Sequence, residues 1–199
     1  MAIDNDQVRE LVLQALETER GGIEVYGAAL ECALDEDLHS EWSKYLDQTR
    51  RHEQIVLDLC EALGFDPNQE TPGRGVVRHI GTSLVGAMRK ALEEGSPDAA
   101  QLVATECVVL AETKDHLNWE LLEEVSKEEK GERKQALADA CKQVEDEEDK
   151  HLYHTQGWSR ELWLDSLGLA AVLPPPEEEK DVATAIGAAR AKQQREQML

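Results

Sequence analysis

The boundaries between helical stretches constrain the fold of this chain more than any other feature. Apolar residues recur at every third or fourth position, the spacing of amphipathic helices, in four long stretches: residues 7–33, 35–63, 97–127 and 132–167. Gly64 ends the second stretch, Gly131 interrupts the pattern between the last two, and Ser96-Pro97 is a typical helix start. The pattern predicts four long helices joined by two tight turns and one long middle connection.

The middle connection carries a short element of its own. Residues 65–75 (FDPNQETPGRG) have the composition of a loop. Residues 76–94 carry an amphipathic pattern that predicts a crossover helix ending at Gly95.

The C-terminal end differs in composition from the rest. Three consecutive prolines at residues 174–176 predict a stiff linker, followed over residues 177–199 by a polar, alanine-rich helix or a disordered tail. We therefore expect a bundle over residues 1–168 and a linker with a C-terminal helix or tail over residues 169–199.

Composition favours an all-α protein. The 199 residues are rich in Ala, Leu, Glu, Gln and Lys and only 4% aromatic. The formal net charge of -21 predicts a surface that repels nucleic acid and anionic membranes. No apolar run reaches the roughly 20 residues that span a bilayer, and the first residues lack the features of a signal peptide. We expect a cytoplasmic protein with neither nucleic-acid nor membrane partners.

The four cysteines predict no Cys-rich metal module. None forms a Cys-x-x-Cys pair, which argues against a structural zinc or rubredoxin-type iron site. All four fall within helical patterns and are expected to be small buried apolar residues: Cys32, Cys60, Cys107 and Cys141.

A Glu-x-x-His pair in the fourth stretch, Glu148 and His151, is the strongest candidate for chemistry. Residues three apart share one helix face, and this pair lies on an apolar stripe: Leu137, Cys141, Val144, Trp158 and Leu162. Burying a carboxylate and an imidazole together is unfavourable unless a partner satisfies them. A divalent metal is one such partner, and a buried hydrogen-bonded pair is the alternative.

The first two stretches each offer one further candidate ligand. Glu19 lies on an otherwise apolar face, where its alternative role is an ion pair with Arg20 or Arg51. His52 lies on the apolar face of the second stretch, where its alternative role is that of a satisfied core histidine. Thr49 occupies the position three residues before His52, and its hydroxyl would hydrogen-bond a metal-bound water more readily than bind a metal.

The third stretch offers two competing glutamates, Glu106 and Glu112. Antiparallel helices share a level at equal distances from their common turn, and each residue rises about 1.5 Å. With the turn centred near residue 130, Glu112 and Glu148 share a level, whereas Glu106 lies roughly 9 Å away from it. Glu106 has the more apolar neighbours, so both remain candidates and Glu112 is favoured. His116 is added as a candidate ligand because its ring can reach the same level.

These residues together resemble the ferritin-like superfamily of carboxylate-bridged di-iron and di-manganese proteins, which includes rubrerythrins, bacterioferritins and manganese catalases. The resemblance consists of Glu19 with Tyr26 seven residues on, His52, and Glu148-x-x-His151, and it extends over about residues 6–165. The segment from Tyr45 to His52 (YLDQTRRH) also resembles stress-associated ferritin-like proteins of bacteria. The implied fold is an antiparallel four-helix bundle with one long crossover.

The resemblance also implies the roles of individual residues. By it, Glu19, His52, Glu112, Glu148 and His151 are metal ligands, and Tyr26 is a redox-active neighbour. Thr49 stands where the family usually has a bridging glutamate, which puts a complete two-metal centre in question. Nothing in the chain matches the Cys-rich electron-transfer module of an intact rubrerythrin.

The function implied is iron oxidation, iron handling or peroxide scavenging. The cofactor would be iron, as two ions if the centre is complete, with manganese or zinc as alternatives, and the partners would be oxygen or peroxide. The competing hypothesis is a metal-free helical stress or scaffold protein. Ferritin-like bundles commonly pair, so a homodimer or larger homo-oligomer is expected, formed through exposed apolar residues: Trp119, Trp163 and Leu164.

Overall fold

The computed structural model describes residues 3–176, 193 and 195–199, and all the regular structure in them is helical. Five long helices follow one another along the chain: α1 (Asn5–Cys32), α2 (Glu36–Leu63), α3 (Pro72–Glu94), α4 (Pro97–Glu128) and α5 (Gly131–Ser166). The all-α class and the two tight turns predicted from the sequence are confirmed. In the described part of the chain, no helix is long and apolar enough to cross a membrane.

Local capping determines where these helices begin and end. The Asp4 carboxylate accepts hydrogen bonds from two backbone N–H groups at the start of α1, and Asp35 does the same for α2. Gly64 follows α2 with a φ of 71°, a left-handed conformation that glycine adopts without strain, and its N–H bonds back to the last turn. Ser96 caps α4, with Pro97 at its first position.

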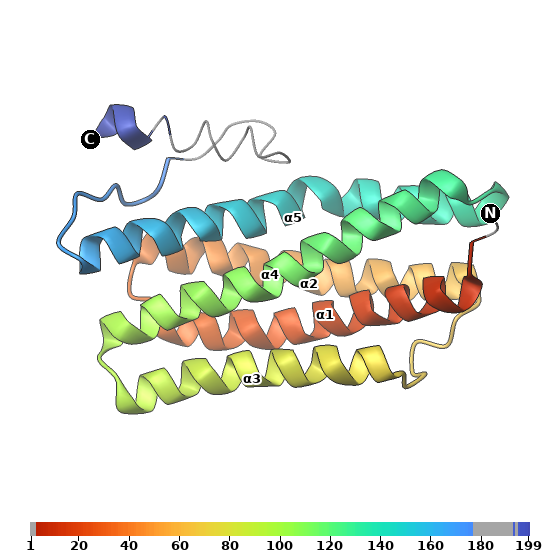
Figure 1. Cartoon of the computed structure of the whole chain (residues 1–199), viewed down its shortest axis with the longest axis horizontal. Helices are drawn as coiled ribbons and strands as arrows, with labels where there is room; N and C mark the ends of the chain where they lie inside the picture. The colour runs from red at the N-terminus through yellow and green to blue at the C-terminus, as the bar shows by residue number, and fades with distance from the viewer. Residues whose placement is uncertain (1–2, 177–192, 194) are drawn as a thin grey trace.

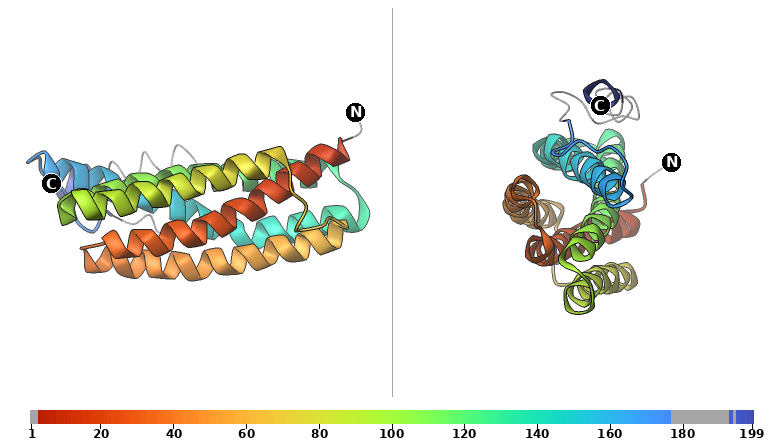
Figure 2. Two further views of the ribbon diagram at one scale, coloured as in Figure 1. Left: turned by 90° about the horizontal axis from the view of Figure 1, so that it is seen from below. Right: turned by 90° about the vertical axis from the view of Figure 1, so that its left-hand side faces the viewer.

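Four of the helices form a closed ring. Helix α1 packs against α2 and α4, and α5 packs against the same two helices (Figure 1). Each helix of the ring runs antiparallel to both of its neighbours. Helices α2 and α4, which lie diagonally across the ring, therefore run in the same direction. Helix α3 lies outside the ring against α1 and α4, as the end-on view in Figure 2 shows.

The crossover helix begins earlier than the sequence pattern predicts. Helix α3 starts at Pro72 because the Thr71 hydroxyl accepts a hydrogen bond from the Arg74 N–H and a proline fits the first position. Arg74, which is 2% exposed, and Arg78 both bond to the buried carboxylate of Glu17 on α1. This ion cluster fixes α3 to the bundle.

The core is divided along its length into two apolar clusters. One cluster is built around Leu13 and Leu16 of α1 and Leu137 and Val144 of α5. The other is built around Tyr26 of α1 and residues nearer the opposite end. Glu19, on the same face of α1, falls between the two. The helices therefore bring a polar layer to mid-bundle with apolar packing on both sides.

The predicted buried cysteines are confirmed. All four are free and buried, and burial raises the pKa of each thiol, to about 11 in Cys32, Cys60 and Cys107 and to about 12 in Cys141. A protonated thiol is a poor metal ligand.

The C-terminal segment touches the end of α5. Arg195 bonds to the carboxylate of Glu161, which is fully buried, and donates to the carbonyl of Ala170. The helix or tail predicted over residues 177–199 lies largely outside the described residues, since 177–192 and 194 are not among them.

Candidate metal centre

Six ionisable side chains meet in the polar layer of the bundle. All are at most 5% exposed, and they come from all four helices of the ring: Glu19 of α1, His52 of α2, Glu112 and Asp115 of α4, and Glu148 and His151 of α5. The layer therefore holds four carboxyl groups and two imidazoles in a space that excludes solvent.

The ligand atoms of this layer form two overlapping groups. His52, Glu148 and His151 present one ligand atom each within 4.8 Å of one another, and so do Glu19, Asp115 and Glu148. Glu148 belongs to both groups. A carboxylate shared in this way is the arrangement that bridges two metal ions.

Both histidines turn the same nitrogen inward. Nδ1 of His52 lies 2.9 Å from Glu148 Oε1, and Nδ1 of His151 lies 3.4 Å from the same atom and 3.7 Å from Glu112 Oε2. The outer nitrogens contact acceptors: Nε2 of His52 is 2.9 Å from Glu147 Oε2, and Nε2 of His151 is 3.0 Å from Gln48 Oε1. An acceptor at Nε2 favours a proton there, so in a neutral imidazole the inner Nδ1 would carry the lone pair that can bind a metal.

Many of the inward-facing atoms have no hydrogen-bond partner in the described part of the chain. These atoms are Glu19 Oε2, Glu112 Oε2, Asp115 Oδ1, both oxygens of Glu148, and Nδ1 of His52 and His151. Buried polar atoms without partners are rare in folded proteins because each one is strongly destabilising. Seven of them around one point indicate a space built for a positively charged ligand.

The electrostatics of the layer reflect crowding of like charges. Burial, together with the charge of Glu148, raises the pKa values of Glu19 and Glu112. Burial and the charge of Glu19 raise the pKa of Asp115 well above its usual range.

The group at the centre behaves in the opposite way. Burial alone would raise the pKa of Glu148, but the adjacent imidazoles of His151 and His52 hold it well below its usual range. Burial alone would lower the pKa of His151, whereas Glu112 and Glu148 raise it to about 10. Without another cation, His151 is thus the main positive charge available to the layer.

Two tyrosines border the centre. The Tyr26 ring is fully buried, 5.9 Å from that of His151 between centroids, and its hydroxyl has no hydrogen-bond partner among the described residues. The Tyr45 ring lies 4.3 Å from that of His151, and its hydroxyl contacts Glu41 and His154. The redox role predicted for Tyr26 remains a prediction, and its position beside the centre agrees with it.

The other predicted residues divide between the centre and its surroundings. Glu19, His52, Glu148 and His151 take part in the two groups, and Glu112 faces His151 from α4. His116 stands apart: its nitrogens lie 3.5 Å from Asp149 and 3.4 Å from Glu120, and it belongs to neither group. Glu106, the competitor of Glu112, is exposed and accepts a hydrogen bond from Trp163.

Sequence reasoning missed Asp115. The candidates read from the third stretch were Glu106, Glu112 and His116, whereas the buried side of α4 carries Ala104, Val108, Glu112, Asp115 and Trp119. Asp115 lies three residues after Glu112, the same spacing as in Glu148-x-x-His151, and that spacing was the available signal.

Thr49 does not face the centre as a ligand. Its hydroxyl donates to the Tyr45 carbonyl of its own helix at 3.0 Å. The resemblance noted in the sequence would place a glutamate at the position of Thr49. The structure has no carboxylate there, but Asp115 of α4 contributes a fourth buried carboxyl group to the layer.

Trp119 was expected to be exposed and is buried. Only 5% of it is accessible, and its indole N–H donates to Glu19 Oε1 at 3.0 Å. It fixes a candidate ligand, so it is not free for contacts between copies of the chain. Trp163, in contrast, is 40% exposed.

Comparisons with known proteins give no assignment for this site. No protein-family model, curated protein or solved structure significantly matches this chain.

Proposed function

We propose that this chain is a metalloprotein of the ferritin-like type, which binds two divalent cations in the mid-bundle layer and uses them in iron oxidation, iron handling or peroxide scavenging. The observation that carries this proposal is the convergence of unpartnered carboxylate oxygens and imidazole nitrogens on Glu148. The order of the helices, with two antiparallel pairs separated by a long crossover, supports the same class.

A charge count is compatible with two divalent cations in the layer. Four carboxylates and two neutral imidazoles carry a charge that two such cations balance. Without metal, the layer would be neutralised by protons on the two histidines and on carboxyl groups whose pKa values are raised, such as Glu19 and Asp115. The described lysines and arginines nearby are engaged elsewhere, since Arg20 pairs with Glu53 and Lys114 with Asn118.

The donor set favours iron or manganese. Oxygen and imidazole ligands suit Fe(II) and Mn(II), and zinc accepts them as well, whereas the soft thiolate ligands preferred by copper(I) are absent from the six residues. Bound Fe(II) ions would supply the electrons for reduction of oxygen or peroxide. The protein supplies the positions: His52, Glu148 and His151 for one ion, Glu19, Asp115 and Glu148 for the other, and Glu112 beside His151.

Residues outside the ligand set would tune the centre. Gln48 and Glu147 hold the outer nitrogens of the two histidines and fix their orientation. The indole of Trp119 orients Glu19. Tyr26 places a phenol next to His151, where it would act as a local electron and proton donor to the oxidised centre.

The test is the metal content of the chain after anaerobic loading with Fe(II) and removal of unbound metal. We expect up to two iron ions per chain in the wild type, oxidised on addition of peroxide, and none in Glu148→Ala. Glu132→Ala, an exposed position at the start of the same helix, is the matched control and should retain wild-type iron.

The metal-free scaffold is the alternative that this experiment separates. The observation in its favour is the position of two imidazoles against Glu148, which protonation could turn into buried ion pairs. Wild-type protein that retains no iron, manganese or zinc would support the scaffold and overturn the proposal.

A further inference from the structure

A pocket on the α4–α5 side of the bundle leads from the surface to the polar layer. Its volume is about 150 Å³, enough for a hydrated ion and several water molecules. Its lining includes Glu148, Trp119 and Asp149, which are buried, and the more accessible His116, Glu120 and Glu145 nearer the surface. We call this cavity the α4–α5 pocket.

Glu148 connects this pocket to the candidate metal centre. The side chain is 1% exposed, neither of its oxygens has a hydrogen-bond partner among the described residues, and it contributes to both ligand groups. It also lines the pocket. A cation that reached the inner end of the pocket would therefore meet a ligand of the centre directly.

The outer part of the pocket carries groups that bind such cations weakly. The two nitrogens of His116 lie 3.5 Å from Asp149 Oδ1 and 3.4 Å from Glu120 Oε1. Among the described residues, neither a lysine nor an arginine lines this pocket. One imidazole between an exposed carboxylate, Glu120, and a buried one, Asp149, would hold a divalent cation briefly and release it inward.

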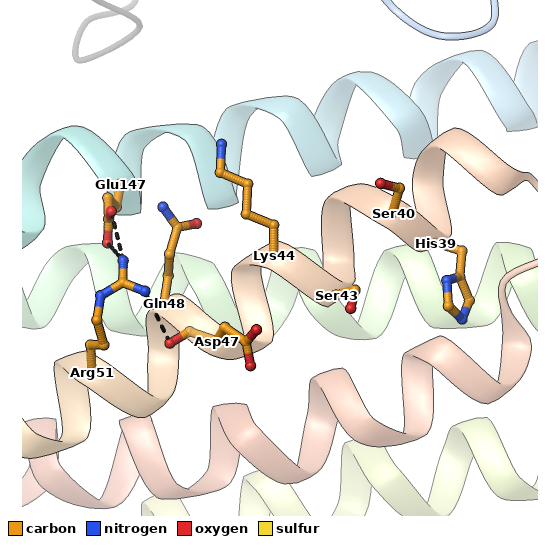
Figure 3. Close-up of a pocket in the computed structure, with 8 residues that line it drawn as sticks. All are labelled: His39, Ser40, Ser43, Lys44, Asp47, Gln48, Arg51 and Glu147. Atoms are coloured by element: carbon orange, nitrogen blue, oxygen red, sulfur yellow. Dashed lines mark hydrogen bonds and ion pairs between the residues drawn. The ribbon is translucent and has the colours of Figure 1, made fainter.

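The neighbouring side of the bundle, between α2 and α5, is less suited to cations. A second pocket, between α2 and α5, has Lys44 and Arg51 in its lining. Figure 3 shows Arg51 joined to Glu147 across the two helices, with distances of 2.9 and 3.0 Å to the carboxylate oxygens. Gln48 lies behind this pair and is bonded to His151. Positive charge and an ion pair thus block this approach.

We propose that divalent cations reach the mid-bundle centre through the α4–α5 pocket, with His116, Glu120 and Asp149 as the transient binding groups. The inference rests on the proposed function, because it presupposes that the centre binds metal. It also gives His116 a role outside the ligand set: it delivers the ion that the six buried residues retain.

The experiment follows the rate of Co(II) uptake by rapid mixing, with the visible absorption of bound Co(II) as the signal. The test variant is the full chain with His116→Gln and Glu120→Gln. The matched control is His39→Gln with Asp47→Asn, which makes the same kinds of change in the α2–α5 pocket. Glu120→Lys, a substitution at an exposed position, is a second test variant for which folding is not at issue.

We expect uptake by both test variants to slow by about tenfold at low ionic strength, the scale of electrostatic steering. The final amount of bound Co(II) should equal that of the wild type. The difference should shrink as salt is added, because salt screens exposed charges. The control should load at the wild-type rate.

Three outcomes would overturn the inference. Test variants that load at the wild-type rate would do so, as would a control slowed to the same extent. A reduced final amount in the test variants would instead make these residues ligands of the stored metal. In all three cases the wild type still binds Co(II), so the proposed function stands; a wild type that takes up no Co(II) would remove both.

Discussion

At the scale of single residues, Asp115 is placed where stability and metal binding conflict. Its carboxyl group is buried beside Glu19, Glu112 and Glu148, which together with burial raise its pKa. We expect Asp115→Asn to stabilise the metal-free protein by about 1 kcal/mol, because the amide needs neither a buried charge nor the uptake of a proton on folding. The same change should weaken metal binding at least about tenfold, or roughly 1.4 kcal/mol.

Denaturant unfolding in chelator and Mn(II) titration calorimetry would measure the two effects of Asp115→Asn. Asp139→Asn, an exposed change of the same type on α5, is the control and should alter neither. Equal metal affinity in wild type and Asp115→Asn would exclude this residue as a ligand.

A substitution at Tyr26 should separate the binding of iron from its oxidation. Its hydroxyl has no hydrogen-bond partner in the described residues, so Tyr26→Phe removes no bond and should keep stability within about 1 kcal/mol of wild type. Bound iron should be unchanged, because the phenol belongs to neither ligand group. Only the rate of oxidation by peroxide should fall. Loss of iron from the variant would make Tyr26 part of the binding site.

At the scale of the helices, α1 and α2 approach closely beside the polar layer. A Cβ at Gly22 would lie 3.1 Å from Cγ2 of Thr49, whereas one at Gly27, a turn further along α1, would meet nothing within 4 Å. Alanine in place of glycine stabilises a helix interior by up to about 1 kcal/mol. We therefore expect Gly27→Ala to gain most of this amount and Gly22→Ala to gain less or to destabilise. Thermal unfolding of both would measure the difference, and equal gains would contradict the close approach.

Helix positions were largely predictable from the sequence, and helix faces less so. Local capping signals at Ser96-Pro97 and Gly64 act within one turn, so the ends of α2 and α4 were read correctly. The start of α3 was missed because Pro72 was read as part of a loop when it is the first helical residue. The face of α4 was misassigned because apolar residues surround this helix: α3 covers one side of it and the ring another.

The same distinction applies to the candidate site. Glu19, His52 and Glu148 stand out because each interrupts a stripe that is otherwise apolar. Asp115 stands among residues that are polar on several sides, so only packing reveals that it points inward. Registers counted from the tight turns chose Glu112 over Glu106 correctly with respect to burial, because the rise per residue is constant.

At the scale of the whole molecule, the mid-bundle layer should make stability depend on metal. A ligand present at about 100 times its dissociation constant stabilises the folded state by about 2.7 kcal/mol. For a chain of this size we expect the melting temperature to rise by roughly 5–10 °C between chelator and saturating Mn(II). Glu148→Ala should melt at one temperature in both conditions. A wild type indifferent to metal would argue against a buried cation site.

In the sequence, the crossover helix α3 separates two helical hairpins, α1–α2 and α4–α5. This separation has consequences for the order in which the protein folds. Each hairpin closes over a tight turn and can form quickly from local contacts. The first hairpin brings Glu19 and His52, and the second brings Glu112, Asp115, Glu148 and His151. The second hairpin already gathers three carboxyl groups, and docking adds Glu19 to them, so docking would be the slow, repulsive stage of folding. If the proposed centre binds metal, dissolved divalent ions would accelerate docking, and the cation would then act during assembly of the bundle as well as in the finished protein.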